Sequence, residues 1–252
     1  MKNVLTLTIA CLCLLMFGYS QEESTDYKMY QMIYLKPKTD KLKELSEAMA
    51  KHNKTYHNEK PYTAHIWMAS TGPHTGEWVW VMGPLTYTDL DSRPDSDEHL
   101  ADWRDNVMPH LKGVSEGEYW KYDDKVSYNP EGAFSGKEIW AMYDIKPFEG
   151  YRFTALLEKV AEVYKEKSYP NYFQVYRSQF SSSSGRDIAI AFSFKNWAFF
   201  DEDDNFWKDY EDVHGEGSKW KFFEEYREVV ESTYDEISTY VPELSGGSDS
   251  DE

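Results

Sequence analysis

Two stretches of the chain that lie 110 residues apart share one pattern, and this repeat constrains the fold more than any other feature of the sequence. Residues 27–37 (YKMYQMIYLKP) align with residues 137–147 (KEIWAMYDIKP), and both alternate like a β-strand before they end at Lys-Pro. The identical pairs are Met32 with Met142, Lys36 with Lys146 and Pro37 with Pro147. A chain that begins each half in the same way is expected to build each half in the same way.

The order of predicted elements after each of these strands is also the same. In the first half, the pattern predicts a helix at 42–52, strands at 62–70 and 77–82, a helix at 99–112 and a strand at 118–122. In the second half, it predicts a helix at 153–163, strands at 172–180 and 187–194, a glycine-broken helix at 205–234 and a strand at 237–241. This β-α-β-β-α-β order is that of a ferredoxin-like unit, whose helices cover one face of an antiparallel sheet.

The first strand of each half is apolar on both of its faces, so each sheet needs cover on the face that its helices leave bare. We therefore predict an α+β fold of two ferredoxin-like repeats, residues 21–129 and 130–244. Their antiparallel sheets would pack face to face as a pseudo-dimeric α+β barrel. Residues 245–252 (SGGSDSDE) have the composition of a disordered acidic tail.

The two strand segments and the order of elements after them resemble the dimeric α+β barrel superfamily, in a tandem form where one chain supplies both halves. The resemblance covers residues 27–244. The superfamily includes cofactor-independent monooxygenases related to antibiotic biosynthesis, haem-degrading enzymes and chlorite dismutases, so it implies a fold and leaves several functions open.

The first 20 residues have the composition of a signal peptide. Lys2 precedes an apolar run at 4–17, and small residues near Ser20 mark a cleavage site. The alternative is an uncleaved membrane anchor, although the run is short for a bilayer. We expect a secreted or periplasmic protein with no membrane association after cleavage. Both cysteines, Cys11 and Cys13, would be lost, which leaves the mature chain without a disulfide or a thiolate.

The composition limits the partners of this protein. The formal net charge is −18, which argues against nucleic acid as a partner because phosphate repels such a surface. An aromatic content of 17% excludes a wholly disordered chain, and a mean hydropathy of −0.73 excludes a polytopic membrane protein. We expect a monomer or a dimer.

Three polar residues interrupt the apolar alternation at strand positions that can face the barrel interior: His65, Asp144 and Arg177. In an apolar cavity, His65 could act as an acid, a base or a ligand, and Arg177 could bind a carboxylate. The alternative is structural, with His65 hydrogen-bonded and Arg177 paired with Asp144. The predicted aromatic walls of the cavity are Tyr30, Tyr34, Trp67 and Trp140.

Motifs for metal and cofactor chemistry are absent from the sequence. A haem protein of the resembled superfamily needs an axial ligand, and the second half contains one histidine, His214, beside a probable helix-breaking glycine. The acidic run at 201–204 lacks the spacing of a calcium loop. We therefore expect no metal and no cofactor, and the sequence names no catalytic residue.

Two functions of different class are compatible with this sequence. The first is an exported barrel protein that binds a small aromatic or apolar ligand. The second, which the resemblance implies, is a cofactor-independent monooxygenase-like enzyme. A third possibility is a barrel filled by its own side chains, with no ligand.

Overall fold

The computed structural model describes residues 27–181, 185–202 and 205–247. The predicted signal peptide lies outside the described residues, and so does the chain from residue 248 onward. Within the predicted tail, Ser245 is buried, and its hydroxyl group bonds to backbone groups of Ile66 and Val241. The packed chain therefore extends past the boundary predicted at residue 244.

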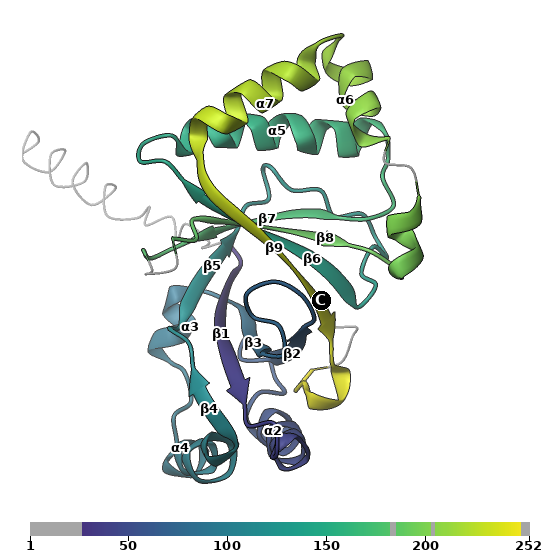
Figure 1. Ribbon diagram of the computed structural model, residues 1–252. Helices are drawn as coiled ribbons and strands as arrows, with labels where there is room; N and C mark the ends of the chain where they lie inside the picture. Colours follow the sequence, from purple (N-terminus) through teal and green to yellow (C-terminus); the bar gives the residue numbers. More distant parts are fainter. Residues whose placement is uncertain (1–26, 182–184, 203–204, 248–252) are drawn as a thin grey trace, which may run out of the picture.

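Eight antiparallel strands form a closed barrel (Figure 1). Their order is β3-β2-β9-β6-β8-β7-β5-β1, and the pairing of β1 with β3 closes the ring. A further strand, β4, pairs with the C-terminal end of β1. The strands are β1 (Met29–Pro37), β2 (Ala64–Ala69), β3 (Trp78–Leu85), β4 (Leu111–Val114), β5 (Glu118–Tyr122), β6 (Lys137–Ile145), β7 (Phe173–Ser178), β8 (Ile188–Ser193) and β9 (Val230–Tyr240).

Helices cover the barrel at two ends of the molecule (Figure 1). The first half carries α2 (Leu42–Tyr56), α3 (Tyr87–Asp91) and α4 (Asp97–Asp102), and the second half carries α5 (Gly150–Glu166), α6 (Phe206–His214) and α7 (Ser218–Val229). Short 3₁₀ turns lie at Met108–His110, Trp197–Asp201 and Pro242–Leu244. In the described part of the chain, the helices lack the length and apolar character that a membrane span requires.

Apolar side chains pack in three main layers. One lies between α2 and the first-half strands, and a second lies between α5, α7 and the second-half strands. The third fills part of the barrel interior. Representative residues are Leu45, Met49 and Trp80 for the first layer, Phe153, Leu157 and Ile190 for the second, and Met32, Trp67 and Met142 for the third.

The two halves are joined by hydrogen bonds as well as by side-chain packing. Strand order is β5-β1-β3-β2 in the first half and β9-β6-β8-β7 in the second, and the seams are β2 with β9 and β5 with β7. The sequence predicts two sheets stacked face to face. Instead they form one continuous sheet, because pairing the edge strands satisfies backbone groups that stacked sheets leave open.

Two predicted helices are shorter than expected. The helix predicted at 99–112 is α4 followed by a π-helical turn (Trp103–Val107) and a 3₁₀ turn, since Pro109 cannot donate a backbone hydrogen bond. The helix predicted at 205–234 is split by Gly215 and Gly217, which have positive φ. It also ends at Val229, because the following residues pair with β6 as β9.

Candidate functional site

The barrel contains a cavity of about 650 Å³, and four of the seven predicted site residues line it. These four are Tyr30, His65, Trp67 and Trp140. The His65 imidazole is buried, and its Nδ1 atom lies 3.2 Å from the hydroxyl group of Tyr240. The aromatic walls that the sequence predicted for the barrel are therefore largely present.

A buried carboxylate, Glu138, also lines this cavity. Its Oε2 atom accepts a hydrogen bond of 2.6 Å from the Trp140 indole, and its Oε1 atom accepts one from the Tyr172 hydroxyl group. Glu138 is absent from the predicted site residues, although it lies two residues before Trp140 on the inward face of β6. The same alternation would have identified it.

A second cluster of polar side chains lies in the barrel interior, away from this cavity. The Tyr34 hydroxyl group donates to Glu236 at 2.5 Å, and the other Glu236 oxygen lies 2.9 Å from His74 Nδ1. The His74 ring stacks on Tyr34 with 3.8 Å between ring centres. Burial, together with the charge on Glu236, raises the pKa of Tyr34 well above its usual value. Tyr34 therefore belongs to a hydrogen-bonded network and is not among the residues that line the cavity.

The cation of this network is Arg186. Its guanidinium group pairs with the buried Glu118 carboxylate and donates to the Tyr234 hydroxyl group at 3.0 Å. Glu118 also accepts a hydrogen bond of 3.0 Å from the Trp120 indole. The Arg186 cation and the Glu118 carboxylate compensate each other within the barrel wall, so we assign this pair a structural role.

Asp144 and Arg177 do not face the cavity, and they do not pair with each other. Arg177 is on the outer face of β7. Its Nε atom lies 2.5 Å from the Asp123 carboxylate, and its Nη2 atom donates to the Thr154 hydroxyl group at 3.0 Å. Asp144 lies at the end of β6 beside Asp187. Burial and the Asp187 charge raise the pKa of the Asp144 carboxyl group.

The position of Arg177 has a simple structural reason. Trp67 faces inward from β2, and Tyr176 faces inward from the corresponding strand β7. The separation of these two residues in sequence is one residue shorter than the 110 residues that relate β1 to β6. Because side chains alternate across a strand, a one-residue difference moves Arg177 to the opposite face.

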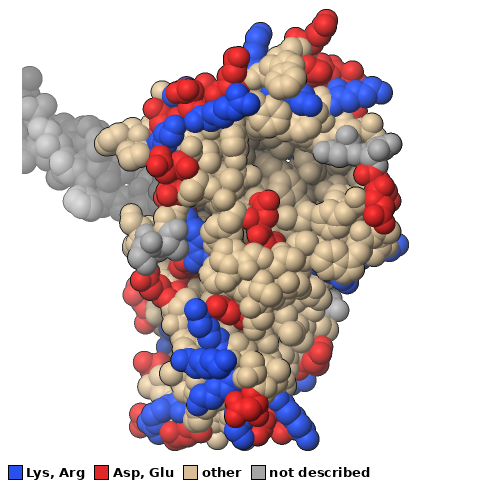
Figure 2. Space-filling model, in the orientation of Figure 1, with Lys and Arg blue, Asp and Glu red and all other residues tan. Residues whose placement is uncertain are grey.

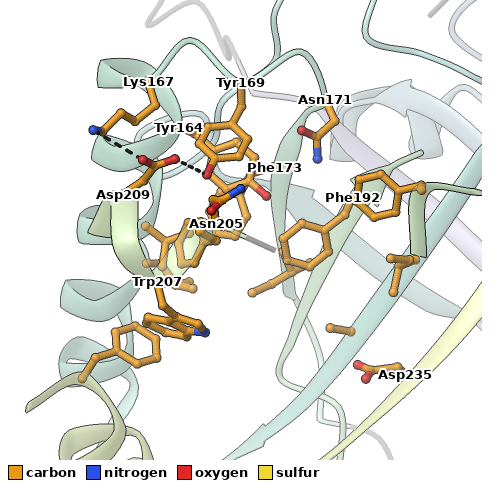
Figure 3. A pocket seen from close by; sticks show the side chains of 18 of the residues that line it. Tyr164, Lys167, Tyr169, Asn171, Phe173, Phe192, Asn205, Trp207, Asp209 and Asp235 are labelled. Carbon is orange, nitrogen blue, oxygen red and sulfur yellow. Dashed lines mark hydrogen bonds and ion pairs between the residues drawn. The ribbon is translucent and has the colours of Figure 1, made fainter. Parts of the chain in front are cut away.

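A larger cavity, of about 950 Å³, lies outside the barrel between the sheet and the helices α5, α6 and α7. Figure 2 shows a hollow beneath these helices, and Figure 3 shows its side chains. Aromatic rings from both layers form most of the wall. They include Tyr164, Phe173, Phe192, Phe206, Trp207, Phe222 and Phe223.

Polar groups gather at one end of this outer cavity (Figure 3). Asp209 accepts a hydrogen bond of 2.9 Å from the Tyr169 hydroxyl group and lies 3.5 Å from the Lys167 ammonium group. Asn205 and Asn171 project nearby. Asp235, on β9, lies apart from this group, and partial burial raises the pKa of its carboxyl group.

The residues of the outer cavity do not supply a histidine ligand for haem. None of the described residues that line it is a histidine. His214, at the end of α6, instead places Nε2 3.0 Å from the backbone oxygen of Lys159 on α5. We therefore derive no chemistry through haem at this site.

No family model and no curated protein matches the chain. Solved structures do match its fold. They include two proteins named as putative monooxygenases, from Fusobacterium nucleatum (TM-score 0.55, 8% identity, 85% of this chain and 92% of that one) and from Lactobacillus acidophilus (0.53, 10%, 85% and 94%). A mutant chlorite dismutase from Candidatus Nitrospira defluvii also matches (0.55, 10%, 87% and 94%). At these identities the comparison establishes a shared α+β barrel fold.

Proposed function

We propose that this protein binds a flat, largely apolar small molecule in the outer cavity. The observation that carries the proposal is the cavity of about 950 Å³ with an aromatic wall. Ligand sites are commonly concave, apolar and about 300–1,000 Å³ in volume. Rings such as Phe192 and Trp207 would stack on or pack edge-to-face against a planar ligand.

The polar end of the cavity limits the chemistry of the ligand. Lys167 is already paired with two carboxylates, since its Nζ lies 3.5 Å from Asp209 and 3.2 Å from Asp212. A full negative charge on the ligand would compete with these pairs. A hydroxyl or carbonyl group on one edge of the ligand fits this end better, because the Asn171 amide is uncharged and can both donate and accept a hydrogen bond.

The first half of the molecule provides a contrast. There the layer between the sheet and α2 holds a packed core that includes Trp78, Trp80 and Met49. The Trp80 indole donates to Asn53 at 3.1 Å, which fixes the ring against the helix. The outer cavity is thus a feature of the second half, where it leaves aromatic surface available for a ligand.

Titration calorimetry with 1-hydroxyanthraquinone, a flat molecule with one polar edge, tests the proposal. Trp207→Ala should weaken binding by about tenfold or more, because it removes a wall ring. Trp220→Ala is the matched control, since Trp220 is 64% exposed on α7 and does not line the cavity. Equal affinity in all three proteins, or no binding by the wild type, would overturn the proposal.

The barrel cavity is the second candidate site, because a buried carboxylate, Glu138, lies among its aromatic rings. Such a group could hold or move a proton on a ligand, which is what a cofactor-independent monooxygenase-like enzyme requires. Trp140→Ala separates the two candidates in the same titration. Loss of binding in Trp140→Ala with normal binding in Trp207→Ala would place the ligand inside the barrel.

We also propose that the chain is an exported tandem of two β-α-β-β-α-β units. The repeated strand order supports the tandem, and the composition of residues 1–20 supports export. N-terminal sequencing of the protein isolated from its natural host should begin near Gln21. A native chain that begins at Met1 would exclude cleavage.

A further inference from the structure

Three buried histidines meet in the first half of the molecule, at the end away from the outer cavity. His52 lies in α2, His57 follows the last residue of that helix, and His99 lies in α4. Their solvent exposures are 1%, 2% and 8%. One potential ligand atom from each ring lies within 4.8 Å of those from the other two.

The hydrogen bonds of the three rings indicate which nitrogen atom of each ring carries the proton. His52 Nδ1 lies 2.8 Å from the Asp102 carboxylate, whereas His57 Nδ1 lies 3.0 Å from the Tyr62 carbonyl and His99 Nδ1 lies 3.3 Å from the Pro94 carbonyl. A carbonyl or carboxylate oxygen only accepts, so each Nδ1 carries the proton. Each Nε2 atom then presents a lone pair. Metal-binding histidines are oriented in this way, by donating their other ring N–H to a carboxylate or a backbone carbonyl.

The distances between the rings suit one metal ion. The ring centres are separated by 5.4 Å for His52 and His57 and by 5.0 Å for each of these rings to His99. A tetrahedral zinc ion about 2.0–2.1 Å from three imidazole nitrogens places the ring centres roughly 5 Å apart. At this spacing, binding of one metal ion would require changes in the tilts of the rings more than movement of the helices.

The neutral imidazole is the form that binds a metal, and the surroundings of His52 and His57 favour that form. Burial lowers the pKa of His57 to about 3 and also lowers the pKa of His52. Aromatic rings enclose the group, since Tyr56 stacks on His99 at 4.6 Å and Trp80 meets His57 edge-on at 5.1 Å. The nearby charges of Asp102 and Arg93 are of opposite sign and oppose each other at the site.

We propose that His52, His57 and His99 bind one divalent transition-metal ion of the zinc class through their Nε2 atoms. Imidazole ligands favour zinc, copper or nickel over calcium or magnesium, which prefer oxygen. The ion would tie the C-terminal end of α2 to α4, two elements that are separated by the strands β2 and β3 in the chain. A fourth ligand position remains for water. This inference does not depend on the proposed ligand of the outer cavity.

The test uses the full chain without a histidine tag and with Cys11→Ser and Cys13→Ser, so that no thiolate competes for the metal. After dialysis against a chelator, one molar equivalent of Zn²⁺ should bind and raise the melting temperature. Co²⁺ alone should give the strong visible absorption of a tetrahedral nitrogen site. This test leaves the three histidines unmutated. If Zn²⁺ does not raise the melting temperature and Co²⁺ gives no such absorption, the proposal is wrong.

Variants then assign the site to these residues. His99→Gln should abolish the Zn²⁺-dependent rise, and Asp102→Asn should weaken Zn²⁺ binding about 10- to 100-fold by removing the partner of His52. His110→Gln is the control, because His110 lies near α4 but outside the three-histidine group. If His99→Gln does not fold, the Asp102→Asn titration still decides. Equal Zn²⁺ affinity in Asp102→Asn and in the His110→Gln control would contradict the assignment.

Discussion

The charged side chains of this barrel are placed by the register of the strands, and their partners follow from it. Arg186 and Arg177 are nine residues apart in sequence, yet they have opposite environments. Arg186 is 6% exposed and pairs with the buried Glu118, whereas Arg177 pairs with Asp123 on the outer face of the barrel. The two arginines therefore offer a matched test of buried against peripheral ion pairs.

Arg186→Met should lower the free energy of unfolding by on the order of 3–5 kcal/mol, because it leaves Glu118 buried without its cation. Arg177→Met should lower it by about 1 kcal/mol or less, since water reaches the Arg177–Asp123 pair. Urea unfolding of both variants measures the difference. Similar losses in the two variants would contradict the structural assignment of the Arg186 network.

Asp144 should make stability depend on pH in the direction opposite to that of most carboxylates. Burial, Asp187 and Glu231 raise its pKa in the folded state above the unfolded value, so the folded protein holds the proton more tightly. This group then favours folding at low pH, and the contribution is lost as the pH rises through the raised pKa. Asp144→Asn should remove that loss. The melting temperature of Asp144→Asn, relative to wild type, should therefore be higher at pH 7 than at pH 4.

In the opposite trend, the melting temperature of wild type would rise relative to that of Asp144→Asn as the pH rises. That trend would show that the Asp144 carboxylate is stabilised by a cation. That result would favour the pairing of Arg177 with Asp144, which the sequence left open as the structural alternative.

At the scale of the elements, the sequence predicted the strands better than the helices. The paired segments at β1 and β6 were identified from their alternation and their Lys-Pro ends, because a half-buried strand has a strict two-residue period. The inward residues Tyr30, Trp67 and Trp140 followed from the same period.

The missed features depend on contacts that local sequence does not contain. The one-residue offset of β7 is set by its register with β5 and β8, and it places Arg177 on the outer face. The outer cavity depends on how far α6 and α7 stand from the sheet. The three histidines come together from α2 and α4, which no periodicity relates.

The break between α6 and α7 provides a test at this scale. Gly215 and Gly217 have φ values of 91° and 79°, and a Cβ atom at either position would meet no other atom within 4 Å. Gly217→Ala should therefore destabilise through backbone strain alone, by roughly 1–2 kcal/mol.

Gly150→Ala is the control, because Gly150 begins α5 with equal space around its Cα. This substitution should be stabilising by about 0.4–1 kcal/mol, since it restricts the unfolded chain. Chemical unfolding of both variants gives the sign. Equal effects would mean that the left-handed backbone at Gly217 is not required.

At the scale of the whole molecule, the end of the chain completes the core of the first half. Val241 and Leu244 belong to the apolar layer between β2, β3 and α2. The Leu244 carbonyl accepts a hydrogen bond of 2.7 Å from Asn53, and Gly246 donates to Ala64 at 2.8 Å. The C-terminal residues thus act as part of a layer built mainly from residues 29–111.

Leu244→Ala should lower the free energy of unfolding by about 2–5 kcal/mol, as for a buried leucine in the middle of a domain. Leu100→Ala is the control, since Leu100 is 52% exposed, and it should change stability by about 0.5 kcal/mol or less. Thermal unfolding measures both. An effect of Leu244→Ala as small as that of the control would mean that the terminal segment is dispensable.

The position of Leu244 also governs when the protein can fold during its synthesis. A ribosome adds about 5–20 residues per second, so the first half emerges on the order of ten seconds before the residues that finish its core. During that interval β2 also lacks its partner β9, and the barrel is open along that seam. The same C-terminal contacts that stabilise the finished molecule therefore postpone closure of the barrel until β9 and residues 241–246 have been synthesised.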